Sequence, residues 1–180
     1  MIKRKSIEHI KLNTDYPLVG MEVGVYKGEN ALNILQNLNI QKLYLIDPYL
    51  PYPDYNPHDL PMPLDLAKRI AYETTKNFPV DYLYKKFVNC TDDDFSNQLF
   101  DFIYIDGEHS EEAFRNDFDR ALGLLKSKSF LCGHDANFPQ IRGVLDFLPF
   151  RSDKVFPDPR ILQNPFGEGW DWLIEFNYGE

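Results

Sequence analysis

The sequence lacks several features that would place it in a specialised class of protein. It has no apolar run approaching the ~18 residues of a membrane-spanning helix, and no apolar stretch follows the basic start at residues 1–5. It has two cysteines, Cys90 and Cys132, whose spacing is not that of a metal site, so we expect buried, reduced thiols. Internal repeats and low-complexity tracts are missing too. These absences favour a globular protein, which we expect in the cytoplasm.

Basic residues are scarce relative to acidic ones. Lysine and arginine total 19 against 28 aspartate and glutamate residues, for a formal net charge of −9. The dense basic spots, residues 3–5 and 85–86, are interpreted as solvated surface. Binding to nucleic acid rests on clustered Lys and Arg, so we expect neither a nucleic-acid nor a membrane partner. The length fits one domain over residues 1–180, and no shift in composition marks a boundary.

Apolar runs alternate with helical patterns along most of the chain. This alternation predicts a parallel sheet with helices on both faces, and two closing strands without a helix between them predict an antiparallel hairpin at one edge. The predicted fold is therefore α/β, a Rossmann-like doubly wound sheet of about seven strands. Strands are expected over 18–24, 42–47, 82–89, 100–106, 129–133, 153–156 and 172–177, and helices over 30–38, 64–77, 110–125 (with Ser110 as N-cap) and 140–148.

The loop after the first strand carries the signal for a bound nucleotide. Gly24 and Gly28 allow a tight turn and a close ligand approach, and the next helix begins just after Gly28. Asp47 ends the second strand, 23 residues after Gly24, where an acid can accept hydrogen bonds from both ribose hydroxyls. Each glycine alone is explained by a turn, but the combination indicates an adenosine-containing cofactor. The loop lacks the G-x-G-x-x-G pattern, which disfavours a nicotinamide-dependent oxidoreductase.

These segments carry a family resemblance. Glu22-x-Gly24-x-x-x-Gly28, followed by the segment LYLIDPY, resembles motif I and the acidic motif of class I S-adenosylmethionine-dependent methyltransferases. The resemblance covers roughly residues 18–177, and Tyr26 stands where many members have a central glycine. It implies S-adenosylmethionine as cofactor, Glu22 and Gly24 near its methionine moiety, Asp47 on its ribose, and a reversed seventh strand beside the sixth.

A second constellation concerns the chemistry. Asp106 ends the fourth predicted strand, His109 follows three residues later, and His134 and Asp135 end the fifth strand. Neighbouring strands bring these side chains to one crevice, beside the cofactor's sulfonium, where histidine is the natural base near neutral pH. Asp106 and Asp135 suit Mg²⁺, and His134 adds a nitrogen ligand for a softer ion. Each residue also has a plain structural explanation as a cap or a packed side chain. Asp117 is interpreted as solvated surface.

The segments IDGEHS and GHD narrow the resemblance to one subgroup. They resemble methyltransferases of the domain family 24 type, including the metal-dependent macrolide-sugar O-methyltransferases. The resemblance implies Asp106 and Asp135 as metal ligands and His109 as base, with Asp106 also at the cofactor. His134 stands where those enzymes have an acidic residue.

Two loops are expected to shape the acceptor pocket. The segment 48–63 contains six prolines and three tyrosines, and we expect it to cover the cofactor and form one wall. A packed surface loop unrelated to ligand is the alternative. The loop over residues 157–169, with Phe166 and the adjacent Trp170, is the candidate for the opposite wall.

The sequence therefore favours an S-adenosylmethionine-dependent methyltransferase acting on an oxygen of a small molecule such as a sugar. The alternative is a non-catalytic adenosine-binding or scaffold domain that retains the fold. The first predicted strand begins by Leu18, so we expect no long helical N-terminal region to shape an acceptor site. A homodimer could complete that site, and the aromatic-rich tail is the candidate interface.

Overall fold

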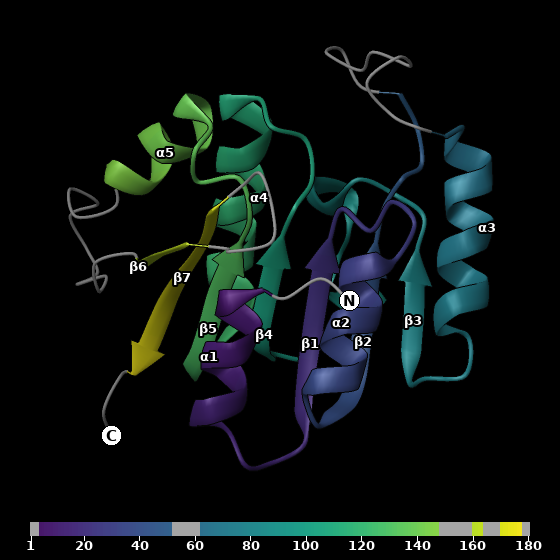
Figure 1. Ribbon diagram of the computed structural model, residues 1–180, viewed down its shortest axis with the longest axis horizontal. Coiled ribbons are helices and arrows are strands. Elements are labelled where there is room, and N and C mark those ends of the chain that lie inside the picture. Colours follow the sequence, from purple (N-terminus) through teal and green to yellow (C-terminus); the bar gives the residue numbers. More distant parts are fainter. Residues whose placement is uncertain (1–3, 52–61, 148–159, 164–169, 178–180) are drawn as a thin grey trace.

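The fold is a seven-stranded sheet with helices on both faces (Figure 1). The computed structural model describes residues 4–51, 62–147, 160–163 and 170–177. The sheet order is β3-β2-β1-β4-β5-β7-β6. Its strands are β1 Leu18–Val23, β2 Ile40–Ile46, β3 Val80–Leu83, β4 Phe100–Ile105, β5 Leu125–Gly133, β6 Arg160–Gln163 and β7 Trp170–Asn177.

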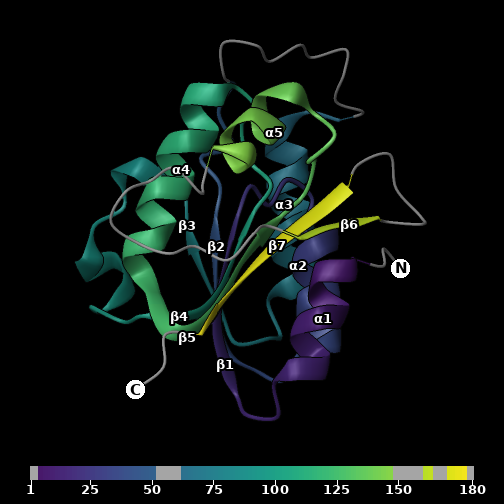
Figure 2. The same cartoon turned by 90° about the vertical axis from the view of Figure 1, so that its left-hand side faces the viewer.

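Two layers of helices cover the sheet (Figure 2), with α1, α2 and α3 on one face and α4 and α5 on the other. Because side chains alternate along each strand, β1 sends Val19, Met21 and Val23 to the face of α4 and α5 and Leu18 to the other. The helices are α1 Lys5–Asn13, α2 Glu29–Asn37, α3 Leu64–Thr75, α4 Glu111–Leu124 and α5 Pro139–Asp146, with 3-10 turns η1 Phe87–Asn89 and η2 Asp92–Phe95.

Strand order reverses between β1 and β4. From β1 the chain builds outward through β2 to β3, and then returns to place β4 on the other side of β1. In open α/β sheets, ligands bind at the carboxyl ends of the strands beside such a reversal. At the far edge, β7 runs antiparallel to both β5 and β6, so it is the reversed strand. The predicted fold class is confirmed.

Several details depart from the sequence-based prediction. The strand expected over residues 82–89 is shorter and earlier, because β3 ends at Leu83 and Phe87–Asn89 form a 3-10 turn. The expected loop 157–169 contains β6. The strand expected over 153–156 and most of the proline-rich segment lie outside the described residues. The Ser110 cap is confirmed, since its hydroxyl accepts a hydrogen bond from the Ala113 amide at 3.3 Å.

The segment before β1 is not simply basic surface. Residues Lys5–Asn13 form α1, which packs its buried Ile7 and Ile10 against the sheet beneath. The preceding residue, Arg4, is buried. The interpretation of residues 3–5 as solvated is therefore wrong for Arg4, because it pairs with the buried Asp171 and the half-buried Asp106.

Two simpler expectations can be compared with the structure directly. Cys90 and Cys132 are buried and form no disulfide, as predicted. Over the described ranges, none of the helices has the length and apolar character needed to cross a membrane.

Candidate functional site: an anion-lined cavity at the strand carboxyl ends

The glycine loop, residues 24–28, is held by the acid that ends β2. The Asp47 carboxylate accepts hydrogen bonds from the backbone amides of Val25 and Tyr26 at 3.0 and 2.9 Å through one oxygen. Its other oxygen accepts from the Tyr49 amide at 2.7 Å. The predicted pair of features, glycine loop and acid, therefore forms one contiguous structure. One oxygen thus already accepts two hydrogen bonds, and the other keeps a second lone pair that a ribose hydroxyl can use.

Gly24 is at a position where only glycine fits. Its φ is +86°, in the left-handed region that residues with a Cβ rarely adopt. A Cβ built there would lie 2.1 Å from the carbonyl oxygen of Asp106. The close approach arises because β1 and β4 are adjacent strands, so the two loops leave the sheet side by side. Gly24 thus brings the glycine loop against the segment that carries Asp106 and His109.

Tyr26 takes the place of the glycine that the resemblance would put in the middle of the loop. Its φ is +49°, an uncommon conformation for an aromatic residue, and its backbone carbonyl accepts a hydrogen bond from the Tyr49 hydroxyl at 2.8 Å. Tyr49, with a φ of +49° as well, is anchored on Asp47. These bonds hold the strained loop without a third glycine.

A cavity of about 590 Å³ lies at this edge of the sheet. That volume is within the range of small-molecule and cofactor sites. It joins the glycine loop to the loop after β4, so both predicted constellations face one space. Its wall includes predicted site residues Glu22, Gly24, Asp47, Asp106 and His109, together with Arg4, Lys27, Lys86 and Asp117.

Glu22 is a buried acid on the cavity wall. Its residue is 1% exposed, and burial raises the pKa of its carboxyl to about 8. Asn30 donates a hydrogen bond to Oε1 at 3.0 Å, which partly offsets that rise, whereas the buried Oε2 has no protein partner. Oε2 is therefore the oxygen of Glu22 that remains available to a ligand.

One end of the cavity adjoins a charged cluster, defined here as Arg4, Asp106, His109, His134, Asp135 and Asp171. Of these, Arg4, Asp106 and His109 line the cavity, and the other three lie behind them. Arg4 lies 3.5 Å from Asp106 and 3.6 Å from Asp171 between guanidinium nitrogen and carboxylate oxygen. Asp171 is fully buried and accepts from the Ser6 amide and hydroxyl, both at 3.2 Å. Burial raises the pKa of Asp106 and of Asp171, and Arg4 opposes both shifts.

Sequence reasoning missed Arg4 and Asp171. Asp171 lies at the start of a strand near the C-terminus, and Arg4 in a basic segment, so neither belongs to a recognisable motif. The one available signal was an acid within the apolar run of β7, where a buried charge requires a partner.

His109 and Asp135 form the second half of the charged cluster. His109 Nε2 lies 3.0 Å from one Asp135 oxygen, and His134 Nδ1 lies 3.0 Å from the other. Burial alone would raise the pKa of Asp135, but the two imidazoles outweigh it and hold that pKa below its usual range. The hydrogen bond to Asp135 in turn raises the pKa of His109. The His109 ring also stacks on Phe138, with ring centroids 5.0 Å apart.

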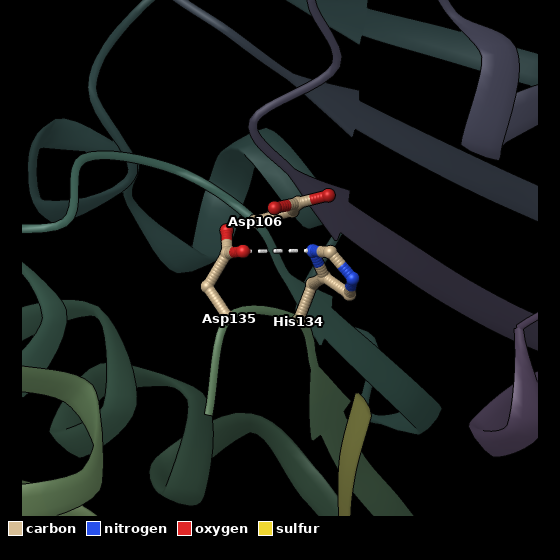
Figure 3. Close-up of side chains that lie close together, drawn as sticks. All are labelled: Asp106, His134 and Asp135. Atoms are coloured by element: carbon tan, nitrogen blue, oxygen red, sulfur yellow. Dashed lines mark ion pairs between the residues drawn. The ribbon is translucent and has the colours of Figure 1, made fainter. Parts of the chain in front are cut away.

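Asp106, His134 and Asp135 converge from the ends of β4 and β5 (Figure 3). One ligand atom from each lies within 4.8 Å of the others. Two carboxylates and an imidazole form a donor set suited to a divalent transition metal. Each donor also has a partner within the protein, since Asp135 bonds two imidazoles and Asp106 pairs with Arg4.

Asp117 departs from its interpretation as solvated surface. It lines the cavity, and burial raises the pKa of its carboxyl to about 7, with a smaller contribution from the nearby negative charge of Glu108. Charged residues lie on more than one side of α4, so their presence alone did not show which of them face solvent. Asp117 lies on the side that faces the loop after β4. It is close to Gly107 in that loop, where an added Cβ would lie 3.6 Å from the Asp117 carboxylate.

Comparison with protein families identifies the class of protein. The model of a family described as a methyltransferase domain matches residues 21–136, which is more than half of the chain. The chain therefore belongs to this methyltransferase family, as the glycine loop and Asp47 predicted. A comparison with curated proteins found no match.

Solved structures of methyltransferases share the fold at low sequence identity. An rRNA methylase from Streptococcus thermophilus has 12% identity and a TM-score of 0.68, with 99% of each chain covered. A SAM-dependent O-methyltransferase from Thermotoga maritima has 9% identity and a TM-score of 0.67, covering 100% of this chain and 68% of the other. The N-methyltransferase NodS from Bradyrhizobium japonicum, in complex with S-adenosyl-L-homocysteine, has 16% identity and a TM-score of 0.64, covering 97% and 84%.

Proposed function

We propose that this protein is an S-adenosylmethionine-dependent methyltransferase that methylates an oxygen of a small molecule. One observation carries the proposal: a single cavity joins the glycine loop and Asp47 to Asp106 and His109. In this arrangement Asp47 holds the ribose, Gly24 lets the cofactor approach the backbone, and Glu22 faces the methionine moiety. Gly28, predicted at the cofactor, does not line the cavity and instead packs against Ala71 of α3. The match to the methyltransferase family and the cofactor product named for the NodS structure support the choice of cofactor.

The proposed chemistry needs alignment and a base. Methyl transfer is a displacement at carbon, so the protein must hold the acceptor oxygen in line with the sulfonium and remove its proton. His109 is the base in this proposal, because it borders the cavity and is 40% exposed on its side chain. Asp135 is a positioning residue that bonds Nε2 and leaves Nδ1 of His109 as the proton acceptor. Asp106 faces the sulfonium end of the cofactor.

A divalent cation fits the donor set of the same cluster. Asp106, His134 and Asp135 would hold it, and when bound it would lower the pKa of an acceptor hydroxyl. The cation would compete with Arg4 for Asp106. Calorimetric titration with Mn²⁺ or Mg²⁺ tests this assignment, with Asp135→Asn as the matched variant. If wild type binds neither ion at millimolar concentration, the metal is removed from the proposal and the cofactor assignment stands.

The acceptor is argued from charge. Two of the solved structures with this fold are described as rRNA methylases, so RNA is the competing acceptor. A net charge of −9 opposes binding to a phosphate backbone. A small-molecule acceptor can bind in the cavity without contacts to such a backbone. Incubation with labelled cofactor and either ribosomal RNA or a panel of sugars and catechols separates the two. Label transferred to RNA would overturn the small-molecule assignment.

The cofactor assignment is tested by calorimetry with S-adenosylhomocysteine. Wild type should bind it, and Asp47→Asn should weaken binding by about 10- to 100-fold through loss of charged hydrogen bonds. Because Asp47 also holds the glycine loop, the same pair is titrated with the 2′,3′-dideoxy analogue. A smaller loss with the analogue assigns Asp47 to the ribose, and an equal loss contradicts that role.

The non-catalytic alternative is separated by turnover. A binding or scaffold domain would hold S-adenosylmethionine without converting it to S-adenosylhomocysteine in the presence of any acceptor. Binding without turnover across the acceptor panel and cell-derived metabolite fractions would favour that alternative.

A further inference from the structure

Arg4 is the buried cation of the cavity. The described residues place three cationic side chains on the cavity wall: Arg4, Lys27 and Lys86. Lys27 pairs with Glu29 at 3.1 Å and Lys86 with Glu108 at 3.7 Å, and their side chains are 30% and 50% exposed. The Arg4 side chain is 10% exposed. A positive charge withdrawn from water at a ligand cavity interacts strongly with an anion placed there.

The hydrogen-bonding capacity of Arg4 exceeds what its partners use. Its two ion-pair distances, 3.5 and 3.6 Å, are longer than the roughly 2.7–2.9 Å of charge-assisted hydrogen bonds. Its Nε is buried and has no hydrogen-bond partner within the protein. A guanidinium offers five N–H donors in a planar fork that matches a carboxylate. A buried donor set left in this state indicates an acceptor supplied by a ligand.

The surroundings of Arg4 indicate what that ligand carries. Glu22 lines the same cavity and has a free Oε2, and Asp106 adds a carboxylate next to the guanidinium. Donors for an anion and acceptors for a cation therefore lie side by side at one end of the cavity. That pattern suits the zwitterionic group of an amino acid, with a carboxylate and an ammonium on one carbon.

We propose that Arg4 binds the α-carboxylate of the cofactor's methionine moiety, with Glu22 and Asp106 facing its ammonium. The inference rests on the proposed function and adds a cofactor-binding residue from outside the glycine loop. Asp171 is a positioning residue for Arg4, because it is fully buried and fixed by two hydrogen bonds from Ser6.

The test compares S-adenosylmethionine with decarboxylated S-adenosylmethionine, which keeps the sulfonium and the amine but lacks the carboxylate. By calorimetry, wild type should bind the intact cofactor about 10- to 100-fold more tightly, the range for hydrogen bonds to a charged group. Arg4→Met should reduce that ratio to below about threefold by weakening only the intact cofactor. Lys86→Met is the matched control, a cation removed from the same cavity wall outside the glycine loop, and should preserve the ratio.

A folding defect is distinguished with a second variant. Arg4→Met leaves Asp171 without its cationic partner, so the double variant Arg4→Met/Asp171→Asn removes both charges together. A variant whose affinity for decarboxylated S-adenosylmethionine equals that of wild type is correctly folded, and either such variant can then be used to measure the ratio. Equal binding of both ligands by wild type, or a ratio that survives loss of Arg4, overturns the inference. Failure of wild type to bind any adenosine ligand instead overturns the proposed function, and the inference with it.

Discussion

The glycine loop and the charged cluster occupy one cavity but are built in different ways. The glycine loop is held by backbone amides, one acid and the Tyr49 hydroxyl, all within residues 24–49. The charged cluster is made by six side chains spread from residue 4 to residue 171. A ligand group common to all members of a family can be held by backbone. Chemistry that differs between members is carried by side chains from separate elements.

The largest effect should come from removing the base of the charged cluster. His109→Gln keeps a polar side chain near Asp135 but loses the proton acceptor, and turnover should fall by about 10²- to 10⁴-fold. Affinity for S-adenosylhomocysteine should change less than threefold, because the glycine loop is untouched. The check is a steady-state assay beside calorimetry. If turnover and affinity for S-adenosylhomocysteine fell by the same factor, the proposed division between a binding loop and a catalytic cluster would be contradicted.

Gly24→Ala adds a Cβ to the glycine loop and should lower the free energy of unfolding by roughly 3 kcal/mol. The added Cβ would meet the Asp106 carbonyl at 2.1 Å in a conformation that strains alanine. Gly143→Ala is the control, since Gly143 lies inside α5 with open space where a Cβ would be added, and it should stabilise the protein by about 0.5–1 kcal/mol. Urea denaturation measures both. Similar values for the two variants would contradict the close approach of the two loops.

Asp117→Asn should stabilise the protein by about 2 kcal/mol at pH 8 and by little near pH 4. The folded-state pKa of Asp117 is raised from 3.8 to about 7 by burial, so the folded protein binds the proton more tightly than the unfolded chain. Stability therefore falls as pH rises from about 4 to 7, and the full penalty persists above 7. The variant lacks that penalty. A difference between the two proteins that does not grow with pH would contradict the burial of this carboxyl.

The smallest effect is expected at Ser110, the N-cap of α4 beside His109 of the charged cluster. Ser110→Ala removes the hydrogen bond to the Ala113 amide and should lower stability by about 1 kcal/mol. Ser110→Asp restores an acceptor at that position and favours the positive end of α4. Thermal unfolding of the three proteins is the measurement, and a neutral Ser110→Ala would show that the cap adds nothing to α4.

The elements that could be predicted are those whose apolar residues form a continuous run or recur with helical spacing in the sequence. Continuous apolar runs located β1, β4 and β5, and the amphipathic stripe located α4, to within a few residues. The 3-10 turn after β3 was mistaken for strand because Phe87 and Val88 are apolar and too few residues follow to show a period. At the site, contiguous residues from Glu22 to Asp47 could be grouped in advance. Arg4 and Asp171 could not, since their proximity exists only after the sheet is assembled.

The contact between Arg4, Ser6 and Asp171 has a consequence for the order in which a ribosome makes this protein. The partners are 165 or more positions apart in sequence, so an emerging chain exposes Arg4 long before it supplies Asp171. A nascent chain that has folded β1 to β5 would have its glycine loop in place and still lack the finished cavity. Completion of the charged cluster would then wait for β7, so a chain folded only through β5 should bind its ligand more weakly.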